Sequence, residues 1–174
     1  MLEYLVSLQG YIQSFLHPGT WLPFAKKYHS EEAEWTFSQP KSTITTNEAM
    51  DAVWSAAQTL DYFVARTKND SNDTMVIDTF TKAKWMDQII FKFGSGTAVV
   101  VHVEASSTGV FPLIIPFAPI LNIFFAFVPF KDFGKNYSAM EKLRKETEKI
   151  MDSNIETKTI RRSLGNPRRK EKKQ

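Results

Sequence analysis

The chain has 174 residues, which is enough for one domain with appendages and for a sizeable core without metals or disulfides. It contains no cysteine, which excludes disulfides, zinc–thiolate sites, iron–sulfur clusters and cysteine nucleophiles. The formal net charge is +3, but the last seventeen residues carry +7, which leaves −4 for the rest of the chain. The basicity therefore belongs to a tail and does not indicate a basic binding face on the domain.

The first segment has an amphipathic pattern. Apolar residues recur at three- and four-residue spacing from Leu2 to Leu16, which predicts a helix with one apolar face. That face consists of Leu5, Leu8, Ile12, Phe15 and Leu16. The helix is either a packing arm on the domain or a helix at a membrane interface, although it lacks the basic polar face of many interfacial helices. Because Glu3 precedes an interrupted apolar run, no cleavable signal or transit peptide is evident.

The middle of the chain changes from helical to strand periodicity. Thr45 and Glu48 have the spacing of a capping box, and the helix that follows is expected to run to about Leu60. The loop before it includes a candidate short strand near residues 35–37. Four later segments have a two-residue period and short connections, which predicts antiparallel strands at 62–68, 74–82, 85–93 and 97–107.

A further helix is expected from Tyr137 or Ser138 to about Met151, with Asn136 as its N-cap. The polar segment after Asp152 is expected to be a disordered basic tail. The order of elements predicts an α+β fold, with one antiparallel sheet of about four strands and helices packed on one face. The predicted organisation is an N-terminal amphipathic helix and loop at 1–44, an α+β domain with an apolar insertion (110–130) at 45–152, and the tail at 153–174.

Three segments resemble, in their order and spacing, the domain of unknown function family fourteen-ninety-nine. They are the helix–strand region "AMDAVWSAAQTLDYFVARTKNDSNDTMVIDTFTKAKWMDQIIFKF", the serine strand "VVVHVEASSTG", and "KDFGKN" before a helix. Matching positions are Asp87, Ser106, Ser107, Asp132, Gly134 and Asn136. The resemblance covers about residues 47–148 and implies a small α+β domain, but it brings no established activity. The chain differs in having no cysteine segment, in having Thr108 where the family has arginine, and in the apolar insertion.

The sequence names no reaction. Its three histidines, at positions 17, 29 and 102, lack metal-ligand spacing, and Ser106 has neither a nucleophile-elbow motif nor a histidine partner in the sequence. An enzyme using Asp87, Ser106 and Asp132 is the least favoured hypothesis. The favoured interpretation is structural: these residues, with Ser107 and Asn136, shape the strand end and the turn into the helix, where a positive φ suits Gly134.

The longest uncharged run is residues 110–130, here called the apolar block. It is long enough for a transmembrane helix, but Pro112, Pro116 and Pro119 would interrupt one. The alternatives are burial as a lid over an apolar cavity, or a loop that enters one leaflet or docks on a hydrophobic partner. The third is favoured, with a short helix at 120–128 and both ends of the block close together. The expected contact residues are Phe111, Phe117, Ile120, Phe124, Phe125, Phe127 and Phe130.

These patterns favour a non-enzymatic membrane- or lipid-associated protein on the cytoplasmic side, with the apolar block as the docking element. The alternatives are a soluble module that binds a hydrophobic ligand under the block, and an integral protein with one span. The expected partner is a lipid or membrane surface, or a hydrophobic protein. The tail could attract phosphates, but it has no aromatic residues for base stacking, so specific nucleic-acid binding is not expected. No cofactor or metal is expected.

Overall fold

The computed structural model describes residues 2–15, 29–38, 44–94, 96, 98–125 and 134–162. The described helices and strands, in chain order, are α1 (Leu2–Phe15), β1 (Ser30–Ser38), α4 (Thr46–Thr59), β2 (Phe63–Asn69), β3 (Thr74–Phe80), β4 (Met86–Gly94), β5 (Val99–Ser107), α5 (Ala118–Phe124), α6 (Lys135–Met151) and β6 (Asn154–Arg161).

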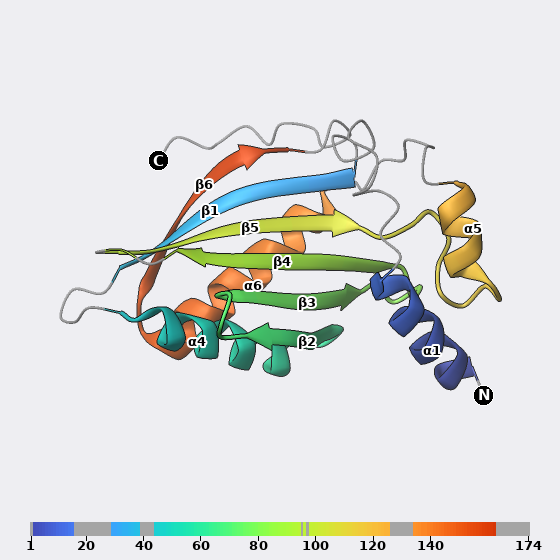
Figure 1. The fold of residues 1–174 in the computed structure, drawn as a ribbon, viewed down its shortest axis with the longest axis horizontal. Helices are drawn as coiled ribbons and strands as arrows, with labels where there is room; N and C mark the ends of the chain where they lie inside the picture. Colours follow the sequence, from blue (N-terminus) through green and yellow to red (C-terminus); the bar gives the residue numbers. More distant parts are fainter. Residues whose placement is uncertain are drawn as a thin grey trace.

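The strands form one sheet in the order β2-β3-β4-β5-β1-β6, and every neighbouring pair is antiparallel. Helices α4 and α6 lie side by side against one face of this sheet, while α1 and α5 lie together at one end (Figure 1). The α+β class with one antiparallel sheet is therefore confirmed. The expected strand number of about four is wrong, because the sheet has six strands.

The two additional strands, β1 and β6, come from segments that the sequence placed outside the sheet. In β1, buried Ala33, Trp35 and Phe37 alternate with more exposed polar residues, so its two-residue period runs from Glu31 to Ser38 and is longer than the short piece expected. In β6 only Ile155 is buried, and the strand forms by backbone pairing with β1 at the sheet edge. The expectation of disorder is thus wrong for 154–161, and residues 163–174 lie outside the described part.

The core lies between the sheet and the helix pair α4–α6. Trp35 and Phe91, both fully buried on neighbouring parts of the sheet, have ring centroids 5.5 Å apart. The helices contribute Met50, Val53 and Leu143 to the same cluster. Burial of these side chains is the dominant favourable contribution to folding of the sheet and its helices.

The start of α4 has the predicted capping box. The Thr45 hydroxyl accepts a hydrogen bond from the Glu48 amide at 3.3 Å, and the Thr45 amide donates to the Glu48 carboxylate at 2.8 Å. This bond from the Thr45 backbone, with a second from its hydroxyl, lowers the pKa of Glu48 below its ordinary value.

The start of α6 differs from the prediction. The N-cap is Gly134, with φ of 77°, and the expected N-cap Asn136 lies inside the first turn. Asn136 is fully buried, and its side-chain amide donates to the His29 carbonyl at 3.2 Å and to the Ser107 hydroxyl at 3.3 Å. Its side chain therefore ties α6 to the strand layer instead of capping the helix, while glycine supplies the left-handed turn.

Candidate functional site

The apolar block forms a compact excursion at the end of the sheet. Between β5 and α6, its described part (110–125) runs through a series of turns into α5, next to α1 (Figure 1). Helix α5 begins at Ala118, two residues before the expected start, with Pro119 in its first turn where a missing amide is harmless. Phe127 and Phe130, two of the predicted contact residues, lie outside the described residues.

Buried Gln9 of α1 holds the backbone of the block. Its side-chain amide donates to the Leu113 carbonyl at 2.7 Å and to the Ile115 carbonyl at 3.0 Å. Its side-chain carbonyl accepts from the Ala118 amide at 3.0 Å. One glutamine thus bonds three backbone groups of this proline-rich segment. Two of these groups also pair with each other, because the Ala118 amide donates to the Ile115 carbonyl at 3.1 Å.

Gln13 and Asn122 continue this arrangement one helical turn along. The Gln13 amide donates to the Thr108 carbonyl at 2.6 Å, and its carbonyl accepts from the Asn122 amide at 3.2 Å. Asn122 also accepts from the Phe111 amide at 2.8 Å and donates to the Phe111 carbonyl at 3.2 Å. We call Gln9, Gln13 and Asn122 the polar seam, since all three are at least 96% buried between α1 and the block.

A glycine at position 109 allows the close approach at the polar seam. A Cβ on Gly109 would lie 2.1 Å from the Asn122 Cγ, so only glycine fits beside that amide. A Cβ on Gly10 would lie 3.4 Å from the Leu113 Cδ1, which is ordinary contact. Leu113 itself is buried with Met86 and Ala118 in a small cluster that joins the block to the sheet end. Polar and apolar contacts together fix the block against α1.

The outward surfaces of α1 and the block are apolar. Among the described residues, sixteen large hydrophobic side chains are exposed; five of them lie on α1 and six between residues 114 and 125. We call these eleven residues the apolar end: Tyr4, Leu8, Tyr11, Ile12, Phe15, Ile114, Phe117, Ile120, Ile123, Phe124 and Phe125. Phe117 and Phe124 are the most exposed of the block, at 71% and 67%. Phe111, also predicted as a contact, is half-buried against Phe125, with ring centroids 5.2 Å apart.

The structure shows which side of α1 faces the protein. Leu8, Ile12 and Phe15, three members of the predicted apolar face, are exposed, while Gln9 and Gln13 face the protein. The helix therefore packs through glutamines and presents its apolar stripe outward, which is the reverse of a packing arm on a globular core.

The sheet places the candidate residues Asp87 and Ser106 on opposite faces. Asp87 lies directly opposite Ser107, whereas Ser106 lies opposite Gln88. Because successive side chains point to opposite faces, Asp87 and Ser107 lie on the face of α4 and α6, and Ser106 lies on the other. Asp132 is outside the described residues. The structure thus joins Ser107 with Asn136, next to Gly134, but it does not bring Asp87 and Ser106 together.

Sequence reasoning missed a group on the opposite face of the sheet. Ligand atoms of Glu32, His102 and Glu104 all lie within 4.8 Å of one another, because β1 and β5 pair side by side. Arg161 of β6 is also there: its guanidinium lies 2.7 Å from the Glu32 carboxylate and 3.9 Å from that of Glu104. The group is therefore an ion-pair network in which one arginine offsets part of the charge of two carboxylates, and its geometry alone does not indicate a metal.

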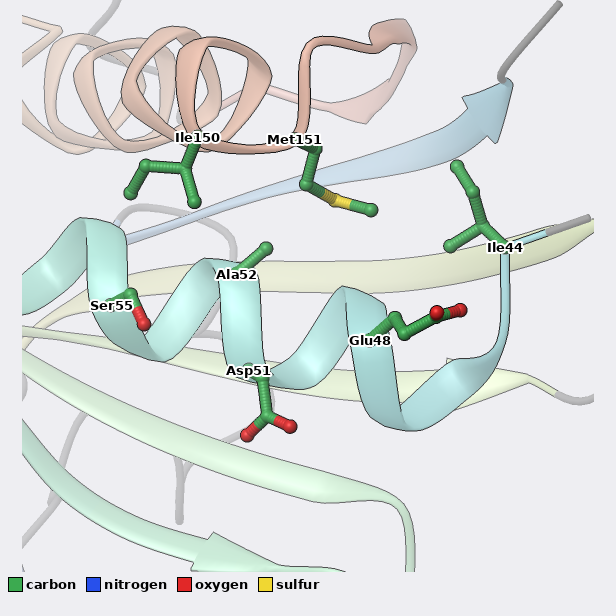
Figure 2. A pocket seen from close by; sticks show the side chains of 7 residues that line it. All are labelled: Ile44, Glu48, Asp51, Ala52, Ser55, Ile150 and Met151. Atoms are coloured by element: carbon green, nitrogen blue, oxygen red, sulfur yellow. The ribbon is translucent and has the colours of Figure 1, made fainter. Parts of the chain in front are cut away.

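A pocket of about 330 Å³ lies between α4 and α6. Figure 2 shows Ile150 and Met151 pointing from α6 toward α4, and Asp51 pointing away from α6. The two acidic side chains at this pocket have structural partners, since Glu48 belongs to the capping box and Asp51 accepts from Lys68 at 2.6 Å. That hydrogen bond raises the pKa of Lys68. Both carboxylates at this pocket are therefore already hydrogen-bonded to other residues of the protein.

Comparison with known proteins gives no identification: no protein-family model matches the chain, and no curated protein does. The resemblance to the domain of unknown function family stays a prediction. Within the residues that the structure describes, every helix is too short or too polar to cross a bilayer.

Proposed function

We propose that this protein is a non-enzymatic, peripheral membrane- or lipid-associated protein that docks through its apolar end. The observation that carries the proposal is the reversed packing of α1 and the apolar block, whose polar side chains are buried and whose apolar side chains are exposed. Exposed apolar side chains gathered at one end of a molecule are typical of interaction sites. The sheet and the helices α4 and α6 serve as the scaffold.

The exposed area provides enough free energy for reversible attachment. Removing the side chains of Phe117 and Phe124 from water would contribute roughly 1–2 kcal/mol each, since about two thirds of each side chain is exposed. The nine other members add to this, and Phe15, which is 66% exposed, contributes about as much as Phe124. Because the polar seam already holds the two elements together, little ordering entropy would be lost on docking.

A membrane is favoured over a hydrophobic protein partner by the residues around the block. The Trp85 indole donates to the Val110 carbonyl at 2.9 Å, and the Lys135 ammonium lies 5.3 Å from the centre of the Trp85 ring. The Lys84 carbonyl accepts from the Leu113 amide at 2.9 Å. Tryptophan and lysine beside an apolar surface are the residue types that meet lipid headgroups.

The alternative of a soluble module with the block as a lid has less support. The two pockets described for this protein are lined by residues outside 110–130. The buried side of the described block contacts α1 and the end of the sheet. Protein side chains therefore occupy the space beneath the described part of the block.

The test is flotation of the full chain with neutral phosphatidylcholine vesicles. The double variant Phe117→Glu/Phe124→Glu should lose most vesicle binding, because two charges would have to enter the apolar region. The matched control is Ile150→Glu/Ile160→Glu, which places the same charges at exposed apolar positions on α6 and β6. The control should float like the wild type.

Equal flotation of both double variants and the wild type would refute docking through the apolar end. If the wild type stays out of the vesicle fraction altogether, lipid association itself is wrong. Thermal unfolding of each variant confirms that the fold is intact, which is expected because the substituted side chains are exposed.

A further inference from the structure

We propose that the apolar end selects anionic phospholipids, and that a lysine-rich pocket beside it holds the headgroup phosphate. This inference rests on the proposed membrane association and assigns it a lipid class. The pocket has a volume of about 280 Å³. Its charged lining consists of three lysines, Lys82, Lys135 and Lys142, and two aspartates, Asp61 and Asp87.

The pocket adjoins the apolar end through a shared wall. Phe80 lines the pocket and also packs against the cluster of Met86, Leu113 and Ala118 that anchors the block. The same ring approaches Gly10 of α1. A second connection runs from Lys135 over the Trp85 ring to the Val110 carbonyl. A lipid whose chains meet the apolar end would therefore bring its headgroup close to the lysines.

The charges at the pocket suit a phosphate group. Three lysines against two aspartates give a formal charge of +1. Lys135 and Ser138 belong to the first turn of α6, a 17-residue helix whose N-cap is a glycine without a capping side chain. The first amides and the dipole of such a helix add to the attraction for an anion. The small net charge matches a single phosphate better than a multiply phosphorylated headgroup.

The lysines come from two separated elements, which explains why the sequence did not indicate this pocket. Lys82 lies in the turn between β3 and β4, while Lys135 and Lys142 lie two helical turns apart on α6. All three are exposed, so each can move toward a ligand. The position of α6 across the sheet brings them to the same pocket.

The experiment compares binding of the full chain to vesicles of phosphatidylcholine alone and of phosphatidylcholine mixed with phosphatidic acid. The wild type should prefer the mixed vesicles. The preference of the variant Lys82→Gln/Lys142→Gln should be about 25-fold lower, because each lysine near an anionic surface contributes about fivefold. The control Lys92→Gln/Lys145→Gln removes the same charge at exposed positions on β4 and α6. It retains the preference, and both variants keep the basic tail.

An equal loss in both variants would overturn the pocket in favour of a general charge effect. No loss in the pocket variant would overturn it directly. Inorganic phosphate separates the two sources of the anion: if it binds the pocket without vesicles and the vesicle preference is unchanged in the pocket variant, the site serves a free ion and the lipid assignment is wrong. Neutral-vesicle binding reports separately on the proposed function, because the lysine substitutions leave Phe117 and Phe124 intact.

Discussion

The two ends of this molecule follow opposite rules of burial. Between the sheet and α4–α6, apolar side chains such as Trp35, Phe91 and Leu143 are inside and polar ones outside. Between α1 and the apolar block, three amide side chains are inside, and most of the large apolar side chains face outward. The first interface is held by removal of apolar area from water, and the second largely by hydrogen bonds between side chains and backbone.

The difference shows how a fold can keep an apolar surface exposed. A proline-rich segment leaves backbone groups without helix or sheet partners, and burying it unpaired would be costly. The polar seam supplies hydrogen-bond partners to this backbone and so removes the cost of burying it unpaired. The block is therefore stable against α1 while its phenylalanines remain exposed. The outward apolar surface then remains available for a partner.

The largest expected effect concerns the apolar interior of the sheet. Phe91→Ala should lower the free energy of unfolding by about 3–5 kcal/mol, because it removes a fully buried ring and leaves a cavity next to Trp35. Urea unfolding followed by circular dichroism measures it. A loss similar to that of an exposed substitution such as Val64→Ala would contradict the view that this interface supplies most of the stability.

The second prediction tests the polar seam. Gln9→Leu removes three hydrogen bonds, and the Leu113 carbonyl loses its glutamine partner, which should cost about 2–3 kcal/mol. The Ala118 amide and the Ile115 carbonyl then keep only the 3.1 Å bond between them. The loss should be local: hydrogen exchange at the Ala118 amide should accelerate by roughly 30- to 100-fold, with a smaller change in global unfolding.

Ser7→Leu is the matched control for this variant, since it adds the same side chain at an exposed position of α1. It should leave exchange at Ala118 unchanged. Gly109→Ala gives an independent disturbance, because its Cβ would collide with the Asn122 amide. If neither Gln9→Leu nor Gly109→Ala affects exchange in the block, hydrogen bonding does not hold this interface.

The smallest effect is expected at the capping box of α4, a helix that packs through apolar side chains on the sheet. Thr45→Ala should cost about 1 kcal/mol at neutral pH. Because the pKa of Glu48 is lowered in the folded state, its contribution is present above the unfolded pKa and is lost as the pH falls through the folded one. Glu48→Gln should therefore be less stable than the wild type at neutral pH and approach it in acid, as followed by thermal unfolding from neutral to acidic pH. A constant difference across that range would contradict this linkage.

Much of the fold could be predicted wherever local chemistry was unambiguous. The capping box, the meander from Phe63 to Ser107 and the helix after Gly134 have strong periodicity or turn residues. The strands β1 and β6 were underestimated because their partners are distant in the chain. β6 has a single buried side chain, and its pairing partner β1 lies more than a hundred residues earlier.

The exposed apolar end was predicted in part. The uncharged block and several of its exposed residues, including Phe117, Ile120 and Phe124, could be chosen from composition and from the prolines. The participation of α1 and its direction could not, because a helical stripe shows that one face is apolar without showing which face meets the protein. The glutamines at 9 and 13 carried a signal, since they lie on one side of the same helix at four-residue spacing.

The sequence by itself determined the helices and the four strands β2 to β5, and that one proline-interrupted apolar segment separates the serine strand from the last helix. Those properties depend on neighbouring residues, through spacing, capping and the restrictions of proline. The tertiary structure decided what each surface faces. Only it could turn the glutamines of α1 inward, separate Ser106 from Asp87, and gather Lys82 with Lys142, because those relations depend on strand pairing and on contacts between residues far apart in the chain.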